Sequence, residues 1–336
     1  MVSLRLHGDT LAAPGMLDFA VNVWPAPRPP ALDAALAAAL ARGDRYPDEN
    51  DARRAVARRH GRDPDEVLLT NGACEAFWLF AHACAPHSAA VIHPSFTEPE
   101  AALRSVGGDV RHVLREPETW RLEPGLVPHE SDCVVLGNPN NPTGTLDPPE
   151  MMLALARPGR SLLLDESFID FAPSADASLA SHREVPGLVV VRSLTKLWSL
   201  AGIRAGYLLA PASIVQRLTA HRQPWSVNAL ACAALEWCAG DADTPRRVAA
   251  EVTAARTELA GTLAQLDGLR VWPSAANFLL IRVADGPRLV DGLRRRGIAV
   301  RPAASFPGLD ERFIRIAVRR SEDNGRLVAA VTELLS

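Results

Sequence analysis

The sequence predicts an α/β protein in which a mostly parallel sheet of seven strands is covered by helices and a smaller α+β unit is attached. Three observations support this fold class. Short apolar runs alternate with helical patterns from about residue 65 onward, as expected when helices connect parallel strands. A chain of 336 residues with 48% hydrophobic content can bury a large core. Beyond about residue 269 the pattern changes to shorter, more widely spaced strands.

The expected strands of the large sheet are short apolar runs bounded by polar or turn residues. They lie at residues 66–70, 89–93, 109–113, 132–137, 161–166, 188–193 and 205–210. Helical patterns separate them, and several open with proline, which is tolerated in a first helical turn. These helices are expected at residues 73–85, 97–106, 148–157 and 211–221.

A second, α+β unit follows a long helical region of about 225–266. Its strands are expected at 269–273, 277–283, 297–302 and 312–318, and its helices at 287–296 and 321–335. The proline-rich N-terminal arm is expected to join this unit. The predicted domains are therefore a large domain of residues 30–243 and a small domain of residues 1–29 and 244–336.

The overall composition argues against several classes of partner. A formal net charge of -3 provides no excess positive field for nucleic acid or an anionic membrane. No apolar run has the length of a signal peptide or a membrane span, so a cytoplasmic protein is expected. The 5 cysteines include no CxxC pair, which predicts reduced thiols and no metal site.

Lys196 is the only lysine in a chain whose other basic residues are all arginines. Lysine can become a neutral amine nucleophile, whereas arginine stays protonated. Lys196 follows the expected strand 188–193, and α/β proteins bind ligands beyond such strand ends. Ser193, Thr195 and Arg204 offer two hydroxyls and a guanidinium for a phosphate. The alternatives are a surface lysine without a role and ordinary polar loop residues.

The segment SLTKLWSLAGIRAGY resembles the lysine segment of the pyridoxal 5'-phosphate (PLP) enzymes of fold type I, in the class I and II aminotransferase family. LGNPNNPTG (136–144) is similar to the family's asparagine loop, and LLLDESF (162–168) to its aspartate strand. The resemblance implies that Lys196 binds the cofactor aldehyde, Asp165 the pyridine nitrogen and Asn141 the ring oxygen. A carboxylate at that nitrogen keeps it protonated, so the ring can accept electrons.

Three further segments resemble cofactor-binding parts of the same family. TNGACEAF (70–77) resembles the phosphate turn, in which the backbone N–H groups of Ala73 and Cys74 face the phosphate. HPSFTEPEAAL (93–103) implies that Phe96 stacks on the pyridine ring; a core phenylalanine is the alternative. RYPDEND (45–51) implies that Tyr46 reaches the cofactor phosphate of a neighbouring subunit, which would make the active unit a homodimer.

Within the family, segments such as LDFAVNVWP (17–25), DESFIDF (165–171) and RQPWSVNALA (222–231) look more like the threonine-phosphate decarboxylases of cobalamin biosynthesis than like the histidinol-phosphate aminotransferases. This resemblance spans essentially the whole chain. In that branch the counterparts of His7, Gly8, Asn22 and Arg301 lie around the substrate phosphate. Arg315 corresponds to the arginine that binds the substrate carboxylate. A phosphorylated amino acid carries two anionic groups and needs two separated cationic groups, which Arg301 and Arg315 supply.

Some positions depart from the family pattern. Phe168 stands where many aminotransferases have a tyrosine whose hydroxyl contacts the cofactor, and it cannot donate a hydrogen bond. Trp24 replaces the second asparagine of an Asn-x-Asn-Pro motif. Arg319 and Arg320 are expected to be solvated.

The resemblance implies a carboxy-lyase that converts O-phospho-L-threonine to (R)-1-aminopropan-2-ol phosphate. The alternative is a histidinol-phosphate-type aminotransferase that uses 2-oxoglutarate. Which occurs depends on which bond of the substrate α-carbon stands perpendicular to the cofactor ring. A PLP-binding protein without catalysis is a third possibility. A nicotinamide dehydrogenase is disfavoured, because no GxGxxG opens the first strand–helix unit.

Overall fold

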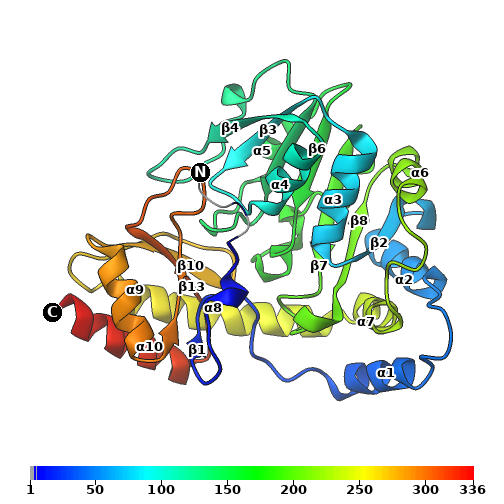
Figure 1. The fold of residues 1–336 in the computed structure, drawn as a ribbon. Coiled ribbons are helices and arrows are strands. Elements are labelled where there is room, and N and C mark those ends of the chain that lie inside the picture. Colours follow the sequence, from blue (N-terminus) through cyan, green and yellow to red (C-terminus); the bar gives the residue numbers. More distant parts are fainter. Residues whose placement is uncertain (1–3, 5) are drawn as a thin grey trace.

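The computed structural model describes residues 4 and 6–336, with a seven-stranded sheet at the centre of the molecule (Figure 1). The strand order is β2-β8-β7-β6-β5-β3-β4. The strands are β2 (Val67–Asn71), β3 (Ser88–His93), β4 (Asp109–Leu114), β5 (Cys133–Gly137), β6 (Ser161–Asp165), β7 (Leu188–Ser193) and β8 (Ala205–Leu209). The predicted fold class is confirmed, and in this sheet both ends of every strand lie within one residue of the predicted ends. In the second unit the strand predicted over 297–302 divides into two short strands that belong to different sheets.

The direction of the strands determines where their polar ends gather. β4, β3, β5, β6 and β7 pair in parallel, whereas β8 is antiparallel to both β7 and β2. All strands except β8 therefore end at the same edge of the sheet, and β8 begins there. In open α/β sheets ligands bind at this carboxyl edge.

Helices cover both faces of the large sheet (Figure 1). Helices α3, α4 and α6 pack on one face, and α2 and α7 pack on the other, with α1 against α7. The helices of this part are α1 (Pro30–Leu40), α2 (Asn50–His60), α3 (Ala73–Cys84), α4 (Glu98–Ser105), α5 (Pro149–Leu153), α6 (Ala212–Ala220) and α7 (Ala229–Gly240). In the part of the chain that is described, no helix has the length and apolar character needed to cross a membrane.

The C-terminal part forms a second, antiparallel sheet with the order β12-β13-β10-β9, and the N-terminal arm adds a short parallel pair, β1-β11. Its strands are β1 (Leu17–Asp18), β9 (Arg270–Val271), β10 (Phe278–Arg282), β11 (Ile298–Ala299), β12 (Arg301–Pro302) and β13 (Phe313–Ala317). Its helices are α8 (Asp243–Leu263), α9 (Gly286–Arg295) and α10 (Ser321–Leu335). The domain limits at residues 30 and 243 remain a prediction.

Two predicted helical regions differ from the structure. The helix expected over 148–157 ends at Leu153, and Arg157 precedes Pro158, a position that disfavours helical backbone. The region 225–266 divides into α7 and α8 at Asp241. The Asp241 carboxylate accepts the backbone N–H groups of Asp243 and Thr244, which begin the second helix.

The expectation that Arg319 is solvated was wrong, whereas Arg320 is exposed. Arg319 is 9% exposed, because the N-terminal arm passes over it. Its guanidinium donates hydrogen bonds to the backbone carbonyls of Asp18 at 2.6 Å and Val21 at 2.7 Å, and to that of Val23. Arg319 therefore fastens the arm to the second sheet.

Candidate active site

A cavity of about 490 Å³ opens at the carboxyl edge of the large sheet, between that sheet, the second sheet and the N-terminal arm. All the residues predicted for the site line it, except Tyr46. The strands and their following loops bring these residues together from positions 7 to 315 of the chain. Their roles toward cofactor and substrate remain predictions, which the following contacts support.

Lys196 lies three residues beyond β7 and faces the cavity. Burial, together with the positive charge of Arg315, lowers the pKa of Lys196 to about 8. A larger fraction of the side chain is therefore neutral near pH 7 than for an exposed lysine, as an amine nucleophile requires. The Nζ atom lies 5.8 Å from the centre of the Phe168 ring.

Asp165 ends β6 and is 9% exposed. Its Oδ1 accepts the backbone N–H of Ser167 at 2.9 Å, and none of the described residues forms a salt bridge with it. Burial raises the pKa of Asp165, because the charged carboxylate loses its water. A protonated pyridine nitrogen placed against this carboxylate would reverse that shift, so Asp165 fits the role predicted for it.

The start of α3 and Arg204 form a compact anion-binding corner of the cavity. Gly72 precedes α3 with φ +76°, and a Cβ there would lie 2.5 Å from Arg204 Nη2, so only glycine fits this approach. Helix α3 begins at Ala73, whose N–H and that of Cys74 lie in the unpaired first turn. Helix N-termini of this kind bind phosphate groups. Burial raises the pKa of the Cys74 thiol, so it is neutral.

Arg301 and Arg315 are direct partners across the antiparallel pair β12–β13. Arg315 Nη1 donates to Asn141 Oδ1 at 2.7 Å and Nη2 to the Ala20 carbonyl at 2.5 Å. Its Nε is buried and has no hydrogen-bond partner among the described residues. Burial, together with the charge of Arg301, lowers the pKa of Arg315 to about 9. The same part of the chain offers no hydrogen-bond partner to Asn22 Oδ1, which is also buried.

The cavity is lined by four cationic side chains, those of Lys196, Arg204, Arg301 and Arg315. Among residues 4 and 6–336, no salt bridge involves Lys196, Arg204, Arg301 or Arg315. Buried charges without partners are costly, so anionic groups are expected to occupy the cavity. PLP would supply a phosphate beside Arg204 and a carbonyl beside Lys196, and the residues present therefore fit this cofactor.

Among the lining residues that the sequence reasoning missed are Glu98 and Phe306. Glu98, the first residue of α4, is 9% exposed and lines the cavity. Phe306 also lines it, with the Arg301 guanidinium 5.0 Å from its ring centre. An acidic residue at a helix start is commonplace, and Phe306 lies in a loop. Neither therefore carries a local signal of function.

Tyr46 lies outside the cavity of its own chain. It is 76% exposed, and its ring stacks on that of Trp225 with a centroid distance of 4.4 Å. Trp225 is itself 58% exposed. The two rings form an apolar patch on the surface, as expected for residues that meet another molecule.

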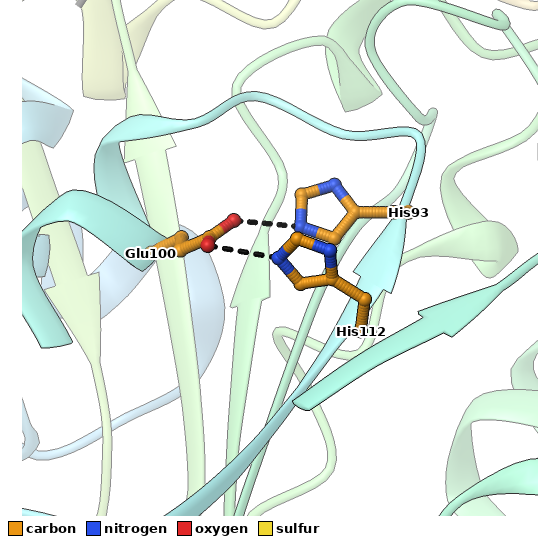
Figure 2. A group of neighbouring side chains, drawn as sticks. All are labelled: His93, Glu100 and His112. Carbon is orange, nitrogen blue, oxygen red and sulfur yellow. Dashed lines mark hydrogen bonds and ion pairs between the residues drawn. The ribbon is translucent and has the colours of Figure 1, made fainter. Parts of the chain in front are cut away.

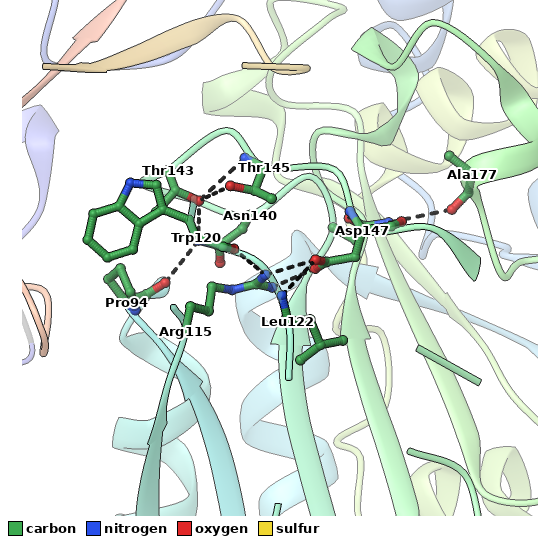
Figure 3. A network of polar contacts seen from close by, with 10 residues as sticks. Pro94, Arg115, Trp120, Leu122, Asn140, Thr143, Thr145, Asp147 and Ala177 are labelled. Atoms are coloured by element: carbon green, nitrogen blue, oxygen red, sulfur yellow. Dashed lines mark hydrogen bonds and ion pairs between the residues drawn. The ribbon is translucent and has the colours of Figure 1, made fainter. Parts of the chain in front are cut away.

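A buried network supports the loop that carries the predicted cofactor-binding asparagine (Figure 3). Arg115 contacts both carboxylate oxygens of Asp147, at 3.0 and 2.7 Å, and the Asp147 backbone N–H donates to Asn138 Oδ1 at 2.8 Å. Asn140 Nδ2 donates to the Pro94 carbonyl at 2.9 Å. The loop is thus fixed both to the large sheet and to the segment after β3.

Arg115→Met is expected to lower the free energy of unfolding by about 3–5 kcal/mol, because it leaves the buried Asp147 carboxylate without its cation. The side chains of Arg115 and Asp147 are 0% and 3% exposed. Urea unfolding measures the effect. Arg270→Met is the matched control, since its ion pair with Glu118 lies on the surface and should contribute little. Equal losses in the two variants would contradict the assignment.

The segment after β3 is held by a second polar group, His93, Glu100 and His112 (Figure 2). Each imidazole Nε2 lies 2.8 Å from its own Glu100 oxygen, and Arg104 Nε lies 2.7 Å from one of them. Burial acts to raise the pKa of Glu100, but these hydrogen bonds outweigh it and lower the pKa to about 2. The distances are those of hydrogen bonds, and Arg104 already supplies a cation. The group therefore orients the turn that carries Phe96.

Comparisons with known proteins agree with this geometry. Residues 14–331 match the model of the family described as aminotransferase class I and II. The chain is 43% identical over 342 residues to a histidinol-phosphate aminotransferase of Mycobacterium tuberculosis, covering 99% of this chain and 91% of the relative. It is 34% identical to a threonine-phosphate decarboxylase of Salmonella typhimurium, covering 96% and 92%.

A solved structure of the same fold agrees with these sequence matches. The histidinol-phosphate aminotransferase of Sinorhizobium meliloti, determined in complex with pyridoxal-5'-phosphate, superposes with a TM-score of 0.84 at 25% identity. The match covers 94% of this chain and 89% of that one. The family match spans nearly the whole chain and includes the lysine, aspartate and arginines of the cavity. The chain therefore belongs to the aminotransferase class I and II family, the PLP-dependent enzymes of fold type I.

Proposed function

We propose that this protein is a PLP-dependent decarboxylase of O-phospho-L-threonine that forms (R)-1-aminopropan-2-ol phosphate for cobalamin biosynthesis. The observation that carries the proposal is the pair of adjacent buried guanidiniums, Arg301 and Arg315, neither of which has a carboxylate partner among the described residues. The substrate has two anionic groups, a carboxylate and a phosphate. Two arginines that leave room for both groups suit such a molecule.

Different residues of the cavity would bind different parts of the cofactor. Lys196 would hold its aldehyde, Asp165 its ring nitrogen, and Asn141 its ring oxygen, with Phe96 against the ring. The phosphate would lie at the start of α3, beside Arg204, Ser193 and Thr195. When bound, PLP supplies an electron sink for the bond that breaks at the α-carbon.

The residues on the substrate side determine which bond breaks. Arg315 would hold the substrate carboxylate, and Arg301, His7, Gly8 and Asn22 the phosphate. Holding the carboxylate in this way would favour cleavage of its bond to the α-carbon and loss of CO₂, because bound PLP would accept the electron pair. Lys196, protonated at that stage, would then deliver a proton to the α-carbon in place of the lost group.

Transamination of histidinol phosphate is the second candidate. It is favoured by the 43% identity to a histidinol-phosphate aminotransferase, which exceeds the 34% identity to a threonine-phosphate decarboxylase. The paired arginines also suit the two carboxylates of a 2-oxoglutarate acceptor. Because both reactions start from the same cavity, a direct assay has to separate them.

The assay incubates the purified holoprotein with O-phospho-L-threonine and measures CO₂ and the phosphorylated amino alcohol. We expect equal amounts of both products, and little CO₂ from L-threonine, which lacks the phosphate. Histidinol phosphate with 2-oxoglutarate is tested in parallel. Glutamate formation in that arm, together with no CO₂ in the first, would replace the decarboxylase with the aminotransferase.

We also propose that the active unit is a homodimer, with Tyr46 completing the cavity of the other subunit. The support is its position on an exposed aromatic patch with Trp225, outside the cavity of its own chain. Sedimentation equilibrium measures the state directly. A fully active monomer would contradict the proposal.

A further inference from the structure

Glu98 connects three separate parts of the chain at the mouth of the cavity. Its Oε1 lies 2.8 Å from His7 Nε2 in the N-terminal arm, and its Oε2 accepts a hydrogen bond from Trp78 Nε1 of α3 at 3.0 Å. The His7 ring is tilted against that of Phe96, with a centroid distance of 5.9 Å. Glu98 thus joins the arm to the wall of the predicted cofactor site.

The same stretch of the arm is held from the opposite side by the second sheet. Arg301 Nη2 donates to the Leu6 carbonyl at 2.7 Å. Gly8 lies so close to the arm's later part that a Cβ on it would be 2.4 Å from the Ala20 carbonyl oxygen and 3.6 Å from Arg315 Nη2. The segment Leu6–Thr10 therefore crosses the cavity mouth between α4 and the two arginines.

Glu98 is unsuited to binding an anionic substrate itself. A carboxylate repels a phosphate, and both Glu98 oxygens already have partners. Because a carboxylate only accepts hydrogen bonds, His7 Nε2 must carry the proton that it donates. This fixes the orientation of the imidazole and leaves Nδ1 as the ring atom that faces a ligand, and Nδ1 donates to a phosphate oxygen when it also carries a proton. Glu98 can therefore act on the substrate only through His7.

We propose that Glu98 is a positioning residue that seats His7, and with it Leu6–Thr10, against the phosphate end of the substrate. The cavity mouth then closes on phosphorylated amino acids in preference to unphosphorylated ones. Arg301 contributes both to seating the arm and to binding the phosphate, since it donates a hydrogen bond to the Leu6 carbonyl and lines the cavity. This inference rests on the proposed function in one respect, that the substrate is a phosphate monoester.

The test compares wild-type holoprotein with Glu98→Gln. Glutamine keeps the shape and an oxygen for Trp78, but its amide N–H₂ meets His7 Nε2 where an acceptor is needed. The dissociation constants of O-phospho-L-threonine and L-threonine are measured from the change in cofactor absorption. We expect the preference for the phosphorylated ligand to fall about tenfold or more, as when a hydrogen bond to a charged group is lost.

A double-mutant cycle shows whether Glu98 acts through His7. His7→Ala should reduce the preference to a similar extent, and adding Glu98→Gln to it should cause no further loss. The PLP content of all variants should equal that of the wild type. Glu150→Gln is the matched control, because Glu150 also lies in the first turn of a helix but is exposed and outside the cavity.

Hydrogen exchange tests, without any substrate, whether Glu98 holds the N-terminal arm in place. The Leu11 N–H, which donates to the Gly8 carbonyl at 3.1 Å, should exchange faster in Glu98→Gln than in wild type or Glu150→Gln. Unchanged preference for the phosphorylated ligand, with or without faster exchange, would overturn the inference. If wild-type protein does not bind O-phospho-L-threonine, the proposed function fails. The exchange rates alone then test whether Glu98 holds the N-terminal arm in place, and equal rates in Glu98→Gln and wild type would overturn that part of the inference.

Discussion

Lys196→Arg is expected to fold normally but to lose covalent attachment of the cofactor and at least about 10³-fold in turnover. The guanidinium stays protonated, so it offers no amine to the cofactor aldehyde and no proton that it can release to the substrate. In the native protein burial lowers the pKa of Lys196 to about 8, which makes the neutral amine accessible near physiological pH.

Attachment is measured by mass spectrometry of proteolytic peptides after borohydride reduction, which should find the cofactor on residue 196 in the wild type and no cofactor in Lys196→Arg. Arg222→Lys is a useful control, because it places a lysine elsewhere, at a partly buried ion pair with Glu49 outside the cavity. That variant should carry the cofactor only on Lys196. A Lys196→Arg protein that still carried reduced cofactor at position 196 would refute the assignment.

Arg315→Gln is expected to lower kcat/KM for the proposed substrate by about 10²-fold or more, since it removes a buried charge-assisted contact to the carboxylate. Arg315→Lys should be almost as impaired, because a single ammonium cannot both hold Asn141 Oδ1 and bind a carboxylate through two nitrogens. Rates of CO₂ release provide the measurement.

Cofactor content separates loss of substrate binding from general damage to the site. We expect PLP to bind both Arg315 variants, because the cofactor phosphate is assigned to the opposite corner at Arg204 and α3. Arg320→Gln serves as the matched control, since Arg320 is exposed just beyond the same strand. Wild-type kinetics in Arg315→Gln would show that the carboxylate binds elsewhere.

The large sheet could be predicted closely because its strands are buried on both faces and appear as continuous apolar runs. Polar residues directly after such strands, such as Asp165 and Lys196, then had to lie at one edge. The positions of Arg301 and Arg315 on neighbouring strands followed from the same reasoning, although only the structure shows that they are direct partners.

The contacts that could not be predicted are those between segments distant in sequence. Arg319 follows directly after β13 and looked solvated, but the arm that covers it comes from the other end of the chain. In the sequence Glu98 looks like any acidic residue at a helix start. Only the fold shows its contact with His7, which lies 91 positions away. No local pattern records such pairings, since they depend on how the arm wraps.

The direct pairing of Arg301 with Arg315 also links the stability of the fold to what occupies the cavity. Like charges opposite each other in a sheet destabilise it, so the second sheet is held under electrostatic repulsion until an anion lies between its arginines. A ligand that binds only the folded state stabilises that state by mass action. The melting temperature of the protein thus reports on the anions it accepts, and a panel of phosphorylated and unphosphorylated amino acids can be ranked without any knowledge of the reaction.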